Sequence, residues 1–75
     1  MILPSKHINL KHSLLGSGAA VLRHIDHPQS ITTLWDQVRS IPEIGAYNRF
    51  ILTLDFLFAI GAIEFANRTI VRRQQ

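Results

Sequence analysis

The chain is short, basic and free of cysteine, and these facts limit what it can be. Its 75 residues leave room for one domain, which buries a smaller share of its surface than a large domain does. Eight Lys and Arg residues against five acids give a net charge of +3, which permits phosphate contact without demanding it. The lack of cysteine excludes a thiolate nucleophile, a disulfide and a cysteine zinc site, and it fits a reducing, cytoplasmic compartment.

Charged residues make up only 17% of the chain, against the roughly 25% that is usual in soluble domains. Few charges leave apolar surface uncovered, which indicates burial against a partner; the alternative is a poorly soluble domain.

The start of the chain lacks a basic region followed by an apolar run, so we expect no signal peptide. The longest apolar stretch, residues 50–63, is shorter than the ~20 residues that span a bilayer, and we therefore expect no membrane contact.

We predict that residues 1–11 form a lead-in segment and that residues 12–75 form the folded domain. Pro4 lacks a backbone donor and holds its predecessor extended. Ile2 and Leu3 are apolar, so they could cover the edge of the core or contact a partner.

The first helix is predicted to run from Ser13, a suitable N-cap, to about Ile25. The step into Pro28 then ends it, because the residue before a proline disfavours the helical region. Gly16 and Gly18 lower the stability of a helix, so we expect another element to cross it closely there.

The second helix follows Ser30, which is again a suitable N-cap. Apolar residues then recur at helical spacing and form one stripe, and Pro42 is expected to stop the helix. The stripe consists of Ile31, Leu34, Trp35, Val38 and Ile41.

The third helix is predicted over residues 46–60 and is apolar on nearly every side. One face should hold Tyr47, Phe50, Ile51, Leu54, Leu57 and Phe58. The opposite face should hold Asn48, Arg49, Leu52, Thr53, Phe56 and Ile60. A helix of this kind is normally buried on both sides. Leu52 and Phe56 are therefore expected either under the lead-in or against another protein.

Gly61 is a suitable stop for the third helix, and a hairpin is predicted to follow it. Residues 63–65 alternate apolar and polar, residues 69–71 are β-branched, and Asn67 between them tolerates a tight turn. The predicted fold class is mainly α with a C-terminal β-hairpin, in the order of a winged-helix-like three-helix domain.

We expect no catalytic site, no cofactor and no small-molecule substrate. The acids are scattered one per element, and a domain of this size lacks depth for a cleft. His24 and His27 lie three apart with Asp26 between them, but a zinc ion needs four ligands or three and water. Solvated histidines at a helix end explain them better.

DNA binding is the main rival to protein binding. A winged helix reads the major groove through polar side chains of its third helix, where this chain offers Arg49 beside Leu52 and Phe56. Apolar residues read bases poorly but anchor protein interfaces well. Three hairpin arginines could contact phosphates without reading sequence, or could only keep the tail soluble; they are Arg68, Arg72 and Arg73.

Four segments carry a resemblance to a known family: residues 1–6 (MILPSK), residues 13–19 (SLLGSGA), the pair Leu34–Trp35, and residues 50–63 (FILTLDFLFAIGAI). With them the chain resembles, over nearly its whole length, the small middle component of bacterial ABC-three-component systems. Lamassu-like anti-phage defence is a related system. In such systems the middle component is made beside an SMC/Rad50-like ABC ATPase and a variable effector protein.

The resemblance implies a non-catalytic adaptor that links the ATPase to the effector in anti-phage or anti-plasmid defence, with DNA contact open within the complex. The residues expected to bind partners are Leu52, Phe56, Arg49, Ile2 and Leu3. One alternative is a small DNA-binding winged-helix regulator. Another is an antitoxin-like or phage-encoded inhibitor of a larger enzyme.

Overall fold

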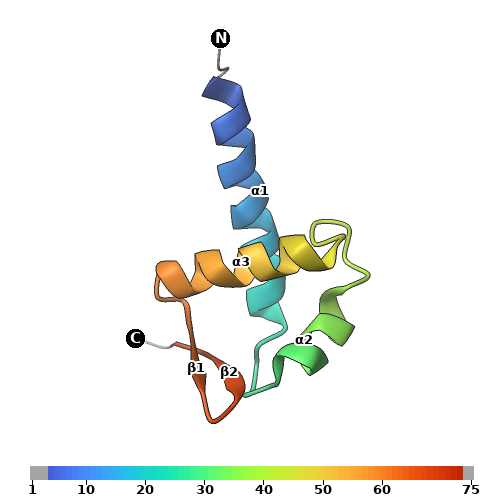
Figure 1. The fold of residues 1–75 in the computed structure, drawn as a ribbon, viewed down its shortest axis with the longest axis vertical. Coiled ribbons are helices and arrows are strands. Elements are labelled where there is room, and N and C mark those ends of the chain that lie inside the picture. Colours follow the sequence, from blue (N-terminus) through green and yellow to red (C-terminus); the bar gives the residue numbers. More distant parts are fainter. Residues whose placement is uncertain (1–3, 74–75) are drawn as a thin grey trace.

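Three helices and a C-terminal hairpin make up the fold, as predicted. The computed structural model describes residues 4–73, and the side chains of residues 13–73. In chain order the elements are α1 (Pro4–Arg23), α2 (Ile31–Val38), α3 (Tyr47–Ala59), β1 (Ile63–Ala66) and β2 (Thr69–Arg72). Figure 1 shows α3 crossing the long α1, with α2 and the hairpin on the same side of that crossing. The prediction of a mainly α chain with a C-terminal β-hairpin is confirmed.

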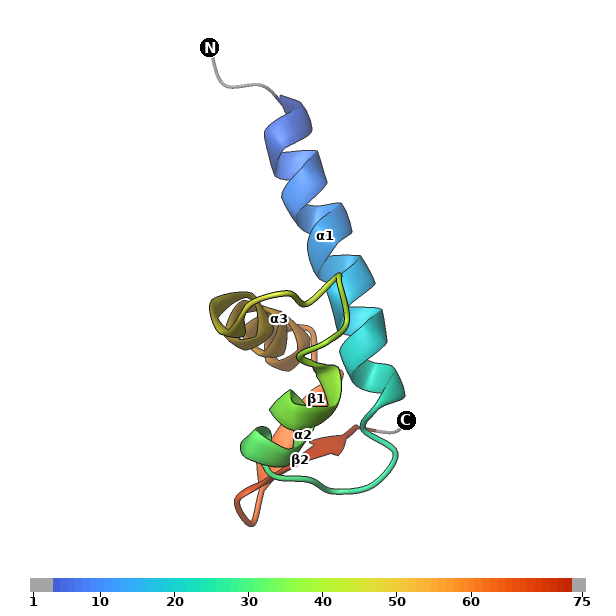
Figure 2. The same ribbon diagram turned by 90° about the vertical axis from the view of Figure 1, so that its right-hand side faces the viewer.

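Helix α1 is longer at its start than the sequence suggested. It begins at Pro4, so the predicted start at Ser13 is wrong. Proline suits the first position of a helix, where its missing donor costs nothing. Ser13 lies inside the helix, and its carbonyl accepts a bond from the Ser17 hydroxyl at 2.9 Å. The helix ends at Arg23, before the predicted Ile25, and its N-terminal half projects beyond the rest of the fold (Figures 1 and 2).

The crossing of α1 and α3 is close at Gly18 and not at Gly16. A Cβ at Gly18 would lie 3.2 Å from Cδ2 of Leu57, which confirms the expected close approach there. A Cβ at Gly16 would meet nothing within 4 Å, so the same expectation for Gly16 is wrong. This approach also buries Thr53, which was predicted to face outward, and its hydroxyl lies 2.9 Å from that of Ser17.

Helix α2 begins as predicted, because the Ser30 hydroxyl accepts the backbone N–H of Thr33 at 3.1 Å. The helix ends at Val38, well before Pro42. Ile41 continues the apolar stripe from the following turn, where it is half-buried. Pro42 therefore lies in the connector after the helix and does not end it.

The core lies between the three helices and the hairpin, and every element contributes to it. Burying one such side chain stabilises the fold by about 1.5–3 kcal/mol. The buried apolar cluster consists of Val21, Ile25, Leu34, Val38, Ile44, Phe50, Leu54, Leu57, Ile63 and Ile70.

The exposed face of α3 differs from the predicted one. Tyr47 and Phe58 were expected inside, yet they are 51% and 38% exposed. Tyr47 lies at the start of the helix, where its ring is edge-on to Trp35 with centroids 5.1 Å apart and tilted against Phe50 at 5.9 Å. The residues that face outward along the helix are Asn48, Leu52, Asp55 and Ala59.

The hairpin pairs β1 with β2 antiparallel, with Phe65 opposite Ile70. Its two turn residues, Asn67 and Arg68, have φ of 53° and 63°. Gly61, with φ of 76°, follows α3 as the predicted stop. The sequence did not predict that the chain entering α2 would join the hairpin. Backbone N–H groups and carbonyls of Gln29 and Ile70 bond in both directions, at 3.2 and 2.7 Å.

None of the helices described over residues 4–73 is long and apolar enough to cross a membrane.

Candidate interaction surfaces

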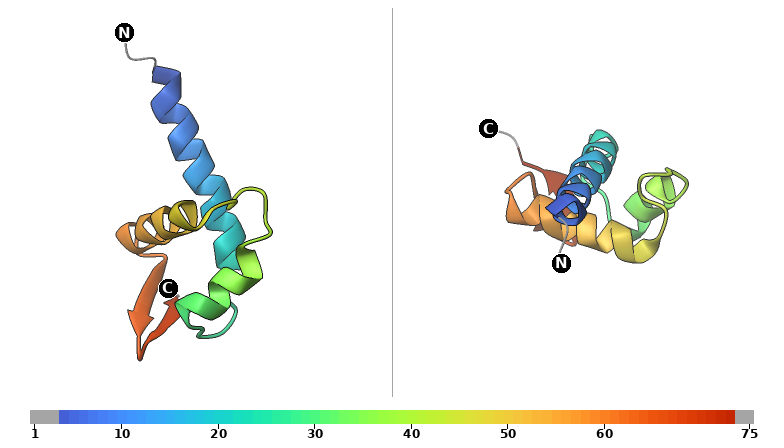
Figure 3. Two further views of the ribbon diagram at one scale, coloured as in Figure 1. Left: turned by 45° about the vertical axis from the view of Figure 1, so that its right-hand side comes forward. Right: turned by 90° about the horizontal axis from the view of Figure 1, so that it is seen from above.

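Helix α1 passes over the middle of α3 and leaves the two ends of α3 on either side (Figure 3, right). Leu52 near the middle of α3, Phe56 one turn later and the C-cap residue Ile60 are spaced four residues apart on one ridge. Leu52 is 44% exposed and Ile60, the C-cap residue, is 59% exposed. The predicted residue Leu52 is therefore accessible, and Ile60 adds to it.

Phe56, the other predicted anchor on α3, is only half-buried. It packs against the core, and its Cε2 atom lies 3.7 Å from the Cβ position at Gly18. One turn earlier on α1, Leu15 is 57% exposed. We call Leu15, Leu52, Phe56 and Ile60 the α1–α3 surface.

Leu15 was not among the residues predicted to bind a partner. Neighbouring residues of a helix point about 100° apart, and of this pair Leu14 is half-buried whereas Leu15 is exposed.

Arg49 lies at the other end of α3, across α1 from Phe56, and is half-buried. Its Nε donates to the backbone carbonyl of Glu43 at 3.1 Å. The ion pairs among the described side chains do not include Arg49. The guanidinium is therefore held in one orientation and does not stand free on the outward face of α3 as predicted. Ile2 and Leu3, the remaining predicted partner residues, lie outside the described residues.

The hairpin carries its three arginines on exposed positions. Arg68 occupies the turn, and Arg72 and Arg73 lie at the end of β2 and just beyond. Nε of Arg73 lies 3.9 Å from the Glu64 carboxylate, and both side chains are more than half exposed. A pair so exposed contributes little to stability. Phe65 on β1 is 52% exposed, so the hairpin also presents an aromatic ring that the sequence pattern did not single out.

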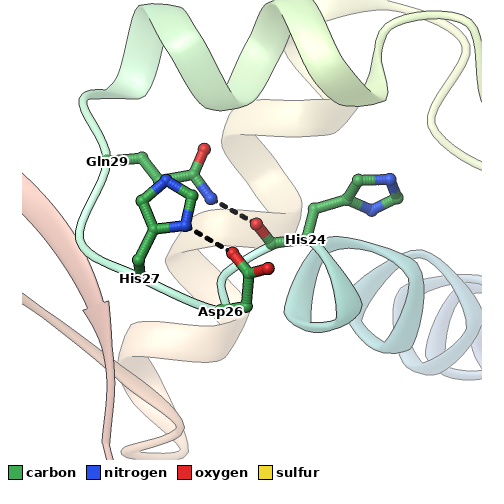
Figure 4. Close-up of polar contacts among 4 residues, drawn as sticks. All are labelled: His24, Asp26, His27 and Gln29. Carbon is green, nitrogen blue, oxygen red and sulfur yellow. Dashed lines mark hydrogen bonds and ion pairs between the residues drawn. The ribbon is translucent and has the colours of Figure 1, made fainter.

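The histidines after α1 make local contacts (Figure 4). Nδ1 of His27 lies 2.6 Å from the Asp26 carboxylate, and Nδ1 of His24 lies 2.9 Å from the Ala20 carbonyl. The Gln29 amide donates to the His24 carbonyl and ties the end of α1 to the segment that joins the hairpin. Among residues with described side chains, no group of three or more His, Asp or Glu is placed to hold a metal ion.

The fold and these surfaces define a small, mainly helical domain with a C-terminal hairpin. The chain belongs to the family of ABC-three component (ABC-3C) system Middle Component 6, whose model matches residues 3–74. The resemblance seen in the sequence is thereby confirmed. As a middle component, the chain has the other components of such a system as partners. Comparisons with curated proteins and with solved structures give no match.

Proposed function

We propose that the chain is a non-catalytic adaptor subunit that joins an SMC/Rad50-like ABC ATPase to an effector protein. The setting is anti-phage or anti-plasmid defence in the cytoplasm. Family membership supports the existence of partners, and the α1–α3 surface supports their being proteins. Exposed large apolar side chains gathered on one surface are typical of an interface that a partner covers.

The outward face of α3 carries the argument for protein over DNA. It presents Asn48, Leu52, Asp55 and Ala59, with one carboxylate and no cation. A helix that enters the major groove approaches phosphates on both sides, so a carboxylate without a neighbouring cation opposes it. Leu52 in the same place supplies apolar contact area, which a protein partner can bury.

The adaptor proposal is tested by adding a charge to the α1–α3 surface. Leu52→Glu adds one at an exposed position, so the domain should stay folded while co-purification with the other system components is lost. Gln37→Glu adds the same charge on the exposed face of α2 and should leave the complex intact. Phe56→Glu should also abolish the complex, but it additionally costs packing because Phe56 contacts the core. A complex that survives Leu52→Glu places the interface elsewhere.

A DNA-binding winged helix remains the second candidate, supported by the element order and by the exposed arginines of the hairpin. Fluorescence anisotropy with a DNA duplex at several salt concentrations separates the two functions. Tight binding by the chain alone, with a sequence preference that Arg49→Ala removes, would favour the DNA function. Binding that is weak and lost on Arg72→Ala would mark phosphate contact only.

A further inference from the structure

A hollow lies beside α1, next to Gly16. It measures about 410 Å³ and is bounded by Ser13 and Gly16 of α1, by residues 42–46, and by Arg49 of α3. Residues 42–46 belong to the segment between α2 and α3, which runs beside α1 in both Figure 1 and Figure 2. The hollow therefore joins parts of the chain that are about thirty residues apart in sequence.

Gly16 keeps the hollow open. Glycine inside a helix costs about 1 kcal/mol relative to alanine. A helical glycine therefore usually marks a place where a neighbouring element packs closely. Gly18 has that neighbour, whereas Gly16 meets nothing within 4 Å among the described residues. A larger side chain at position 16 would enter the hollow, so the space is one that the described side chains of residues 13–73 leave open.

Arg49 gives the hollow its charge. Its Nε is anchored on the Glu43 carbonyl, which fixes the plane of the guanidinium at the edge of the hollow. The Nη donors form no ion pair with a described side chain. A fixed guanidinium suits a carboxylate, which it can bind through two parallel hydrogen bonds.

The sequence of α1 also favours an acidic partner, because the helix is basic. Helix α1 contains Lys6, Lys11 and Arg23 and no Asp or Glu, and the first acid of the chain is Asp26. The lining is otherwise mainly apolar, with Pro42, Ile44 and Ala46 among its residues. Glu43 is the one acid among the lining residues, and the apolar lining beside Arg49 suits a protein segment better than a nucleic-acid backbone.

We propose that this hollow receives an acidic segment of a partner protein, with an apolar side chain beside Gly16 and a carboxylate on Arg49. The inference rests on the proposed adaptor function, because the partner is another component of the same system. It concerns a different set of residues, since none of the four residues of the α1–α3 surface lines the hollow.

The space is tested by filling it. Gly16→Leu places a side chain in the hollow from a Cβ position that has no described atom of another segment within 4 Å, and leucine favours a helix more than glycine does. The variant should unfold at a higher temperature than the wild type, and its affinity for the purified partner components should fall at least tenfold. Thr32→Leu is the control, because Thr32 is exposed within α2 and belongs neither to the hollow nor to the α1–α3 surface. Its affinity should stay within twofold of the wild type.

The contact between Arg49 and a carboxylate of the partner is tested by crosslinking and by removing the charge of Arg49. In the complex with the partner components, Arg49→Lys should gain a carbodiimide crosslink from position 49 to an Asp or Glu of a partner, mapped by mass spectrometry. Arg49→Gln should bind several-fold more weakly and lose part of the salt dependence of binding. A crosslink from position 49 to a second copy of this chain would overturn the proposal. Competition for the hollow by a DNA duplex would also overturn it.

The outcomes separate the two proposals. If Leu52→Glu abolishes the complex while Gly16→Leu binds as the wild type does, the hollow is not a binding site and the adaptor function stands. If Gly16→Leu abolishes the complex while Leu52→Glu does not, the hollow is supported and the α1–α3 surface is wrong. If the wild-type chain binds no system component, both proposals fail.

Discussion

Gly16 and Gly18 lie two residues apart in α1 and should respond oppositely to the same substitution. A new methyl group at Gly16 enters open space, since nothing lies within 4 Å of it. A new methyl group at Gly18 lies 3.2 Å from Cδ2 of Leu57, closer than the ~3.5–4.0 Å at which carbon atoms pack. The two substitutions therefore distinguish two contributions to stability: the helix propensity of alanine and the packing of α1 on α3.

The magnitudes follow from these two environments. Alanine is favoured over glycine inside a helix by about 1 kcal/mol, and Gly16→Ala should gain all of it. For a domain of this size, 1 kcal/mol raises the melting temperature by roughly 4–8 °C. Gly18→Ala gains the same preference but forces Leu57 to move, which costs about 1–3 kcal/mol in a packed core. Its net effect should be between zero and a loss of about 2 kcal/mol.

Thermal and urea unfolding of the isolated chain, followed by circular dichroism at 222 nm, measures both variants. The double variant should equal the sum of the two, because the two sites touch different neighbours. Equal stabilisation by both substitutions would mean that α1 does not approach α3 at Gly18. Destabilisation by Gly16→Ala would mean that the hollow beside it is filled by part of this chain.

Two further substitutions test local structure. Ser30→Ala removes the acceptor for the Thr33 amide and should cost about 1 kcal/mol in urea unfolding, whereas Ser40→Ala at an exposed position should change little. Arg68 has a φ of 63°, in the left-handed region, and Arg68→Gly removes the backbone strain of a non-glycine residue there. The variant should be more stable by about 0.5–1 kcal/mol, because Asn-Gly is the preferred pair for such a hairpin turn. A loss of stability in Arg68→Gly would show that the arginine side chain supports the hairpin.

Elements set by short-range signals could be predicted from the sequence. Ser30 caps α2 because its hydroxyl reaches an amide three residues away, and Gly61 ends α3 because glycine accepts a positive φ. The hairpin followed from β-branched residues around Asn67. Each of these signals depends on residues that are neighbours in the chain.

Features that depend on contacts across the chain could not be predicted. Thr53 is buried because α1 comes close at Gly18, and nothing near Thr53 in sequence indicates this. Gln29 joins the hairpin through Ile70, which lies forty-one residues away. The start of α1 was misplaced for another reason, since a serine such as Ser13 suits an N-cap while a proline such as Pro4 suits the first position of a helix. Of the proposed sites, the exposed residue Leu52 was predicted from the sequence, whereas the hollow at Gly16 became visible only in the structure.

An adaptor must hold two proteins at once, so its two binding sites cannot overlap. Leu15 and Gly16 are neighbours on α1 and therefore point about 100° apart. Leu15 belongs to the α1–α3 surface, and Gly16 opens on the hollow. Helix α1 thus lies between two different sites. The α1–α3 surface is apolar, whereas the hollow combines an apolar lining with the charge of Arg49. Two partners seated in this way would occupy separate sites. Gly16→Leu and Leu52→Glu should therefore each weaken the binding of a different component, and the double variant should lose both.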